Sequence, residues 1–336
     1  MPDSTAMGAG EGLYSHCRRV AAWSLALQDA AKGARVDELL EVAEAMDQHF
    51  AWEPYSDGEE PPGPAAAAAL DCLRSSTAAD LDHAIAALPV FPAAAQRALH
   101  VIVGDQWSST ELEAAASADQ TLASQILAAA NSWTGPSHGR IATISQAVTY
   151  IGASRTAQIL YAASAKVLFE RGGERGLWLH SLAAARAAET IATLTRSFPP
   201  KEAFLGGLVH DIGRLAMLML PSAFQSRFLH LTAAGCEPFL VERVLSGFSH
   251  AQAGARALAG WKFPEPLVTG IEFHHQPEKT ENKLASILYL MEYWADSRED
   301  SPSAARLKVA LDRTGMNEAD LRQLTLKDDR GMDGLR

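Results

Sequence analysis

The chain has 336 residues, 48% of them hydrophobic, which is enough apolar material for one large or two medium domains. Alanine and leucine dominate, aromatic residues make up only 7%, and β-branched runs are short, so the composition favours helices. With 29 basic and 40 acidic residues the net charge is −11, which opposes binding to a nucleic-acid backbone, and no local basic patch offsets it.

Cysteine usage and the N-terminal sequence predict a cytoplasmic protein. The three cysteines are Cys17, Cys72 and Cys236. They lie far apart and form no C-x-x-C pair, which indicates reduced thiols. The first residues (MPDSTAMGAGEG) contain neither a basic nor an apolar stretch, so no signal peptide is expected. The most apolar segment, 205–220, is interrupted by three ionisable residues and predicts a buried helix, not a membrane span.

Residues 1–64 are expected to form a small helical unit. Apolar residues recur at helical spacing between 13 and 50, and the segment 53–64 (EPYSDGEEPPGP) has the acidic, Pro- and Gly-rich composition of a linker. A connecting helix is expected over 65–87, ending at Leu88–Pro89.

From Pro89 onward the sequence predicts a succession of helices separated by Pro, Gly and capping residues. No segment alternates with a period of two, so the expected fold class is all-α. Asp119 can cap a helix that ends near Asn131–Ser132, and Gly152 separates two later helices. The helices are expected over about 92–103, from 108–110 onward, and over 119–132, 143–151, 154–170, 176–196, 201–219, 222–234, 237–246, 249–260, 264–275 and 281–296, followed by a charged tail, 297–336, with one or two short helices.

The second half of the chain concentrates residues of the kinds that ligate metal ions. The candidate ligands are His180, His210, Asp211, His250, His274 and His275. Imidazole and carboxylate ligands together suit Fe, Mn, Zn or Mg better than metals that prefer thiolates. The adjacent His210–Asp211 pair could supply a nitrogen ligand and a carboxylate that bridges two ions, as in metal-assisted phosphoryl chemistry. A single helical histidine is most often packed or solvated, but this set is hard to explain without a shared role.

The segment 207–215 (GLVHDIGRL) resembles the GLLHDIGxL signature of HD-type proteins. The motifs around it resemble, in order, those of the HDOD (HD-related output domain) family. They are Leu88–Pro89 with Phe91–Pro92 (LPxxP), Ala130–Ser132 (ANS), Gln146–Gly152 (xAIxxLG), Trp178–Ser181 (WxHS), His250–Ala255 (HaxxGA), Trp261–Pro264 (WxLP) and the pair His274–His275. The resemblance covers about 88–296.

The resemblance implies a compact, multi-helix HDOD domain over 88–296 and a role in bacterial signal transduction. The related HD phosphohydrolases, including the HD-GYP cyclic-dinucleotide phosphodiesterases, bind two or three metals at such positions. By this resemblance the six candidate residues would be ligands of a divalent metal, with Fe, Mn, Mg and Zn as the candidates.

Four positions depart from the catalytic relatives. A carboxylate expected one helical turn before the first histidine is Gly176, and the lysine that follows HDIG is Arg214. A late aspartate ligand is either replaced by Glu292 or displaced to Asp296, and Gln276–Lys279 stands where a GYP segment would follow the paired histidines. Each departure argues against cyclic-di-GMP hydrolysis, and none excludes metal binding.

A weaker similarity lies near the N-terminus. Tyr14–His16 resembles the entry to the helix that carries His180, and Met46–Asp47 follows His16 at the spacing at which His210–Asp211 follows His180. These residues could be the relic of a second HD-like half or a chance match of two amphipathic helices. In either case too few ligands remain there for a metal centre.

Two functions from different classes follow. The preferred one is a regulatory module without catalysis that acts through a signalling protein partner or a small ligand, involves neither nucleic acid nor membrane, and is compatible with an oligomer. The alternative is a metal-dependent phosphohydrolase acting on a nucleotide or a cyclic dinucleotide, in which Asp211 would be the catalytic residue. A histidine-rich helical scaffold without any ligand ranks lowest.

Overall fold

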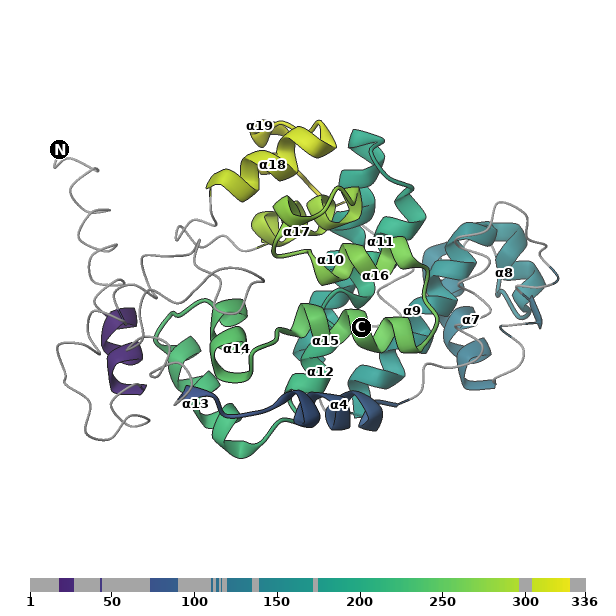
Figure 1. Cartoon of the computed structure of the whole chain (residues 1–336). Coiled ribbons are helices and arrows are strands. Elements are labelled where there is room, and N and C mark those ends of the chain that lie inside the picture. Colours follow the sequence, from purple (N-terminus) through teal and green to yellow (C-terminus); the bar gives the residue numbers. More distant parts are fainter. Residues whose placement is uncertain are drawn as a thin grey trace, which may run out of the picture. The chain divides into compact units, whose positions relative to one another are not determined.

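The structure of the chain is a computed structural model (Figure 1). It describes residues 18–26, 43, 73–89, 110, 113–114, 116, 120–134, 139–171, 175–295 and 304–326. Within them every regular element is a helix and no strand is present, so the expected all-α fold is confirmed. None of the described helices is both long enough and apolar enough to cross a lipid bilayer.

Some expectations concern residues outside the described part of the chain. They are the linker over 53–64, the helix over about 92–103, His16 and Met46–Asp47 of the N-terminal similarity, and Asp296.

The chain divides into two compact units, each assembled from separate segments. The first consists of Met1–Ala87, Ala216–Ala253 and Arg298–Ala304, and the second of Leu88–Leu215, Gly254–Ser297 and Ala305–Arg336. The domain limits expected from the sequence stay a prediction.

In the first unit, helix α4 (Ala78–Ala87) begins at a capping box. The backbone N–H of Thr77 donates to Oδ2 of Asp80 over 2.7 Å, and the N–H of Asp80 donates back to the Thr77 hydroxyl over 3.3 Å. Residues 74–77 before it are not helical, so the helix expected over 65–87 is interrupted there. The N–H of Ser75 donates instead to the carbonyl of Leu245 in α14 (Pro238–Ser246) over 2.6 Å.

Among the described residues, the first unit also contains α13 (Ser222–Ala233), α14 and the helical residues 18–26. Glu237 caps α14, since its carboxylate accepts from the N–H groups of Phe239 and Leu240 over 3.1 and 2.7 Å. Burial raises the pKa of Glu237, although these two backbone hydrogen bonds act against the shift. The helix ends at Gly247, whose φ of 82° is a left-handed conformation that glycine adopts without strain.

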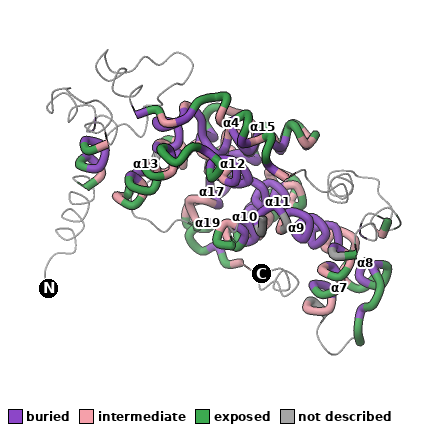
Figure 2. The backbone as a smooth tube through the Cα atoms, turned by 90° about the horizontal axis from the view of Figure 1, so that it is seen from below, coloured by how far each residue is buried: buried purple, intermediate pink, exposed green. Residues whose placement is uncertain are grey.

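The second unit holds most of the helices and a dense core. Its elements are α7 (Gln120–Thr134), α8 (Ile144–Ile151), α9 (Ala153–Arg171), α10 (Arg175–Thr195), α11 (Pro200–Val209), α16 (Glu265–Glu272), the 3-10 helix η2 (Pro277–Lys279), α17 (Lys283–Ala295), α18 (Ala304–Thr314) and α19 (Glu318–Arg322). Helices α12 (Gly213–Met217) and α15 (His250–Gly260) lie where the chain passes from one unit to the other. Much of α9, α10 and α11 is buried (Figure 2).

A glycine sets the close approach of α10 and α11. A Cβ atom added at Gly207 would lie 2.6 Å from the carbonyl oxygen of Ala184 and 2.8 Å from the Cα of Ala185, both backbone atoms of α10. Only glycine allows the two backbones to come this near. The close packing of α10 and α11 therefore depends on Gly207, which lies three positions before His210.

Two helices end earlier than the periodicity predicts. The helix expected over 201–219 stops at Val209, turns over 210–212 and resumes as α12, and the helix expected over 264–275 stops at Glu272. In both places a histidine ring lies against a carbonyl of the last turn: Nδ1 of His210 is 2.8 Å from the Gly207 oxygen, and Nδ1 of His274 is 2.6 Å from the Ile271 oxygen. The first contact gives the Gly207 carbonyl at the helix end a partner, and the second adds to the hydrogen bond that the Ile271 carbonyl accepts from the backbone N–H of His274 over 3.5 Å. The predicted helix ends were wrong because apolar periodicity does not register such a cap.

Asn131 connects α7 to the chain that precedes α8. Its side-chain amide donates to the carbonyls of Leu127 and Ile141 over 2.7 and 2.8 Å, and its side-chain oxygen accepts from the N–H of Ile141 over 2.8 Å. The helix continues past it to Thr134, so the predicted end near Asn131–Ser132 was wrong by a short stretch. The ANS segment therefore contributes a structural link.

Candidate metal centre

Four side chains of the second unit converge on one point. His180 comes from α10, His210 and Asp211 from the turn after α11, and Glu292 from α17. One ligand atom of each lies within 4.8 Å of the ligand atoms of the others. Three of the sequence candidates are thus brought together, and Glu292, which the sequence offered as a replacement for a late aspartate, joins them.

The contacts between these side chains are short. The Nε2 atom of His210 lies 2.7 Å from Oε1 of Glu292, and the Nε2 atom of His180 lies 3.1 Å from the same oxygen. The two Nε2 atoms are 3.2 Å apart, and each is 3.6 Å from Oδ2 of Asp211. Two nitrogens and two carboxylate oxygens therefore face a shared space.

Backbone carbonyls set the tautomers of two histidines. A carbonyl oxygen only accepts hydrogen bonds, so Nδ1 of His210, next to the Gly207 oxygen, carries a proton. The same holds for Nδ1 of His274 next to the Ile271 oxygen. In the neutral ring Nε2 is then the lone-pair atom, which is how ligating histidines are oriented in metal sites.

The convergence of acceptor atoms requires a positive charge. The Nε2 lone pair of neutral His210 and the Glu292 carboxylate cannot approach to 2.7 Å without a proton or a cation between them. The hydrogen bond to Glu292 raises the pKa of His180, which favours the protonated ring beside this carboxylate. Burial alone would raise the pKa of Glu292, but hydrogen bonds from His180 and His210 hold it well below its usual range.

The donor set suits a divalent cation. It offers imidazole nitrogens and carboxylate oxygens and no thiolate, the combination preferred by Fe, Mn, Zn and Mg over softer metals. His210 and Asp211 are buried, whereas the side chains of His180 and Glu292 are 35% and 24% exposed, so an ion could reach the cluster from solvent. A candidate metal-binding cluster is therefore present, and the metal itself stays a prediction.

Arg214 modifies this cluster. Its Nε donates to Oδ2 of Asp211 over 2.7 Å, and that oxygen is the one lying 3.6 Å from each of the two histidine Nε2 atoms. The carboxylate expected to bridge two ions is therefore already held by a guanidinium, which remains charged at any pH the protein experiences. Gly176, the other departure on this side, is exposed, and nothing lies within 4 Å of a Cβ atom added there.

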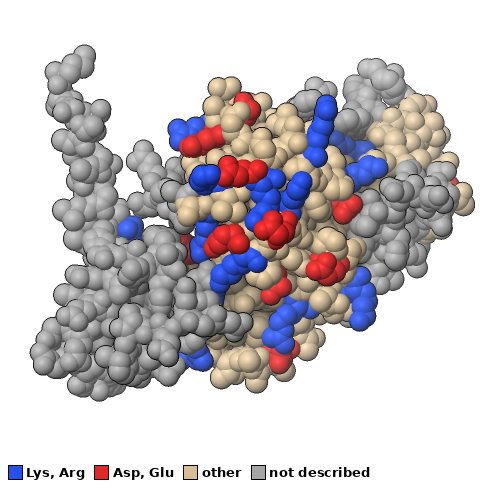
Figure 3. Space-filling view, turned by 45° about the horizontal axis from the view of Figure 1, so that its top comes forward, with Lys and Arg blue, Asp and Glu red and all other residues tan. Residues whose placement is uncertain are grey.

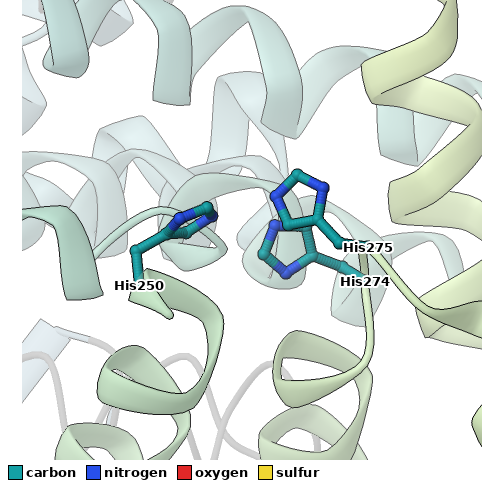
Figure 4. Close-up of side chains that lie close together, drawn as sticks. All are labelled: His250, His274 and His275. Carbon is teal, nitrogen blue, oxygen red and sulfur yellow. The ribbon is translucent and has the colours of Figure 1, made fainter. Parts of the chain in front are cut away.

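The paired histidines lie near the cluster. His274 is fully buried, and its ring meets that of His210 edge to face, with centroids 5.3 Å apart. The ring of His275 lies 4.1 Å from that of His274, centroid to centroid. Figure 4 shows both side chains in the segment that follows α16, together with His250 at the start of α15.

His250 is counted with the first unit, where a buried carboxylate holds it. Oε2 of Glu242 accepts from the backbone N–H of His250 over 2.8 Å and lies 2.7 Å from its Nδ1. Glu242, only 1% exposed, therefore orients His250 with Nε2 directed away from it. Glu242 is not among the residues predicted from the sequence, although an acid within the apolar helix PFLVERVLS indicates a carboxylate that needs a buried partner.

Comparisons with known proteins agree with this architecture. The model of the HDOD domain family matches residues 88–277. An uncharacterized protein of Treponema pallidum is 25% identical over 223 residues, which cover 63% of this chain and 43% of that protein, so the chain spans less than half the length of this relative.

Solved structures of similar fold cover about three quarters of the chain. A "Putative phosphohydrolase" of Shewanella amazonensis is 25% identical with a TM-score of 0.59, over 76% of this chain and 97% of that one. An HDOD domain protein of unknown function from Geobacter sulfurreducens is 20% identical with a TM-score of 0.62, over 76% and 91%. A "Putative signal transduction protein" of Marinobacter aquaeolei is 18% identical with a TM-score of 0.61, over 77% and 62%.

Proposed function

Because the chain belongs to the HDOD domain family, we propose that it is a regulatory module of bacterial signal transduction that does not catalyse hydrolysis. The module would act through a protein partner or a small ligand, and its histidine–carboxylate cluster would bind a divalent cation. His180, His210, Asp211 and Glu292 are the proposed ligands, and His250, His274 and His275 stay predicted members of the set.

The contact between Arg214 and Asp211 carries the proposal. Hydrolysis by two metal ions requires a pair of cations about 3.5–4 Å apart that clamp the attacking and leaving oxygens. In this chain the carboxylate expected to bridge the two ions is that of Asp211. Its Oδ2, which lies 3.6 Å from both histidine Nε2 atoms, already accepts a hydrogen bond from the charged guanidinium of Arg214. A second divalent ion would have to displace this guanidinium or bear its repulsion. The cluster therefore favours a single cation.

A bound divalent cation would supply Lewis-acid polarisation of a ligand oxygen. The residues of the chain would hold and orient the side chains that bind the cation. The Gly207 carbonyl holds the ring of His210 in one tautomer, Glu292 orients His180, and Arg214 fixes the carboxylate of Asp211. Such an arrangement can hold an ion or an anionic ligand in a defined state, which is what a signalling module requires.

The test is hydrolysis by the full chain. Wild-type protein supplied with Mn²⁺, Fe²⁺ or Mg²⁺ should not turn over cyclic dinucleotides or nucleoside phosphates. Asp211→Asn keeps the shape of the side chain while removing its charge, and Asp312→Asn, on the exposed surface of α18, is the matched control. Metal-dependent turnover that disappears in Asp211→Asn and persists in Asp312→Asn would contradict the proposal.

That outcome would establish the second candidate, a metal-dependent phosphohydrolase. The observation in its favour is the completeness of the donor set, with two imidazoles and two carboxylates within 4.8 Å. The similarity to the "Putative phosphohydrolase" of Shewanella amazonensis supports hydrolysis in general. In this case Arg214→Ala should raise turnover, because a second cation would no longer meet the guanidinium.

A further inference from the structure

The two helices at the C-terminal end of the second unit, α18 and α19, lie beyond the residues matched by the HDOD family. Their sequence is charged, yet Ala310 and Leu321 are fully buried, and Met316 and Leu324 are each 7% exposed. Figure 1 shows both helices beside α17. They are packed parts of the unit and have specific contacts.

The first set of contacts is made with the segment that follows the paired histidines. Nη1 of Arg313 donates to the carbonyl of Pro277, and Nη2 lies 3.1 Å from Oε1 of Glu281. The Arg313 side chain is only 14% exposed, so its contact with the carbonyl is largely shielded from water. Arg306 adds an ion pair of 2.8 Å with Glu278. Helix α18 thus holds η2, which begins two residues after His275.

The second set of contacts is made with the end of α17, directly after Glu292. The indole N–H of Trp294 donates to the carbonyl of Leu324 over 3.2 Å. The hydroxyl of Tyr293 lies 3.5 Å from Oε1 of Glu318, the first residue of α19. The two residues that follow Glu292 in the chain are therefore both tied to the region of α19.

We propose that α18 and α19 form a brace that holds Glu292 and the paired-histidine segment in place and so couples cation binding at the cluster to the C-terminal helices. The inference rests on the proposed cation site. Ligand residues must be held within fractions of an ångström, and side chains that support ligands change metal affinity substantially when they are lost. Linkage makes the coupling reciprocal: if the brace favours binding, binding favours the docked brace.

In this role Arg313 and Trp294 are positioning residues, and α18–α19 is the element through which a partner could sense the cluster. On the face shown in Figure 3 basic and acidic side chains lie next to one another. The brace itself carries paired charges, Lys308 with Asp312 and Arg322 with Glu318. Its specific contacts are the hydrogen bond that Arg313 donates to the Pro277 carbonyl and the one that the Leu324 carbonyl, just after α19, accepts from Trp294.

The experiment compares two charge-removing substitutions on one helix of the full chain, with Mn²⁺ as the probe. Arg313→Met removes the contacts with Pro277 and Glu281, whereas Lys308→Met removes only an exposed pair with Asp312 on α18. Titration calorimetry should show Mn²⁺ affinity weakened about 10- to 100-fold in Arg313→Met. The affinity of Lys308→Met should match that of wild type. In wild type, Mn²⁺ should slow hydrogen exchange of the amides over 304–326.

Hydrogen exchange in chelated protein separates this inference from the proposed function. If wild type binds no Mn²⁺, the cation site is refuted. The brace is then tested separately: the backbone amides over 276–279 and 290–295 should exchange faster in Arg313→Met than in Lys308→Met. If Arg313→Met does not fold, Trp294→Phe replaces it as the test variant, because it removes one hydrogen bond. Trp294→Phe should weaken Mn²⁺ binding and speed amide exchange at the end of α17. Unchanged affinity and unchanged exchange in the variants would overturn the brace.

Discussion

Two histidines of this chain each cap a helix through Nδ1, which leaves Nε2 as the ring atom available to other partners. His210 and His274 both place Nδ1 on a carbonyl three residues earlier. The same contact thus ends a helix and selects a tautomer, so structure and ligand chemistry cannot be changed independently at these positions. In a third case the buried Glu242 takes the place of the carbonyl and holds Nδ1 of His250. A carbonyl or a carboxylate can serve because each accepts a hydrogen bond.

The interaction between His180 and Glu292 predicts that the stability of the chelated protein depends on pH. The pKa of His180 is raised above 6.5, so its contribution is complete below pH 6.5 and is lost as pH rises through the folded value. The pKa of Glu292 is lowered below 4.5, so its contribution is complete above pH 4.5 and is lost as pH falls through the folded value. The pair therefore stabilises the fold most between these two limits.

Glu292→Gln removes this contribution. Urea unfolding of wild type and variant should give a difference in unfolding free energy that is largest near pH 5.5 and shrinks well above pH 6.5, where His180 loses its proton. Asp312→Asn, which alters an exposed pair, should show no such trend. A difference that grows toward alkaline pH would contradict the assigned charges.

At the scale of elements, the site depends on how closely α10 and α11 pack. His180 is on the first of these helices and His210 directly follows the second, so their separation sets the distance between the two Nε2 atoms, 3.2 Å. Gly207 allows this approach, and Trp178, which packs on Phe169 of α9 at 5.6 Å between centroids, anchors the first turns of α10. Packing between helices therefore determines the geometry of the ligands.

Gly207→Ala should disturb both stability and binding. Its Cβ would meet backbone atoms of α10 at 2.6–2.8 Å, and a backbone cannot move aside as a side chain can. We expect a loss of about 1–3 kcal/mol in unfolding free energy, as for other overpacked cores, and weaker Mn²⁺ binding. Gly176→Ala is the matched control within α10, because nothing lies within 4 Å of its added Cβ. It should be neutral or stabilising by about 0.5–1 kcal/mol. Equal effects of the two substitutions would refute the packing argument.

At the scale of the whole molecule, the two units differ in the histidine and carboxylate side chains that they contain. The second holds the cluster of two histidines and two carboxylates, and the first contributes the Glu242–His250 pair. The signalling proposal assigns the cluster one cation, because Arg214 already supplies positive charge next to Asp211. The number of ions per chain is therefore the property that distinguishes a module from a two-metal hydrolase.

The full chain should bind about one Mn²⁺ per molecule, and binding should stabilise it. A free Mn²⁺ concentration of about 100 times Kd should add about 2.7 kcal/mol to the free energy of unfolding. A rise in the melting temperature would detect this stabilisation, and a chelator would reverse it. The stoichiometry is measured by elemental analysis of dialysed protein, with Glu292→Gln as the variant expected to lose the ion. Two or more ions per chain would contradict the single-cation proposal.

Local sequence patterns are sufficient to predict the fold class and three of the four residues of the cluster. Helical periodicity and the absence of alternating segments sufficed for the all-α fold, because these patterns are local. His180 and His210–Asp211 could be picked out because each lies in a compact motif whose residues are neighbours in the chain. The same local information was poor at helix ends, since the caps at His210 and His274 depend on ring orientation, which periodicity does not encode.

Tertiary structure alone decided which acid joins the histidines and what Asp211 contacts. Glu292 was one of two alternatives in the sequence, and the packing of α17 places its carboxylate 2.7 Å from His210, a residue 82 positions earlier in the chain. Arg214 stood out in the sequence as a departure from the usual lysine, but only the structure shows that its guanidinium contacts Asp211. The physical reason is that ligand chemistry depends on distances of a few ångströms between residues far apart in the chain, and only the packing of helices sets those distances.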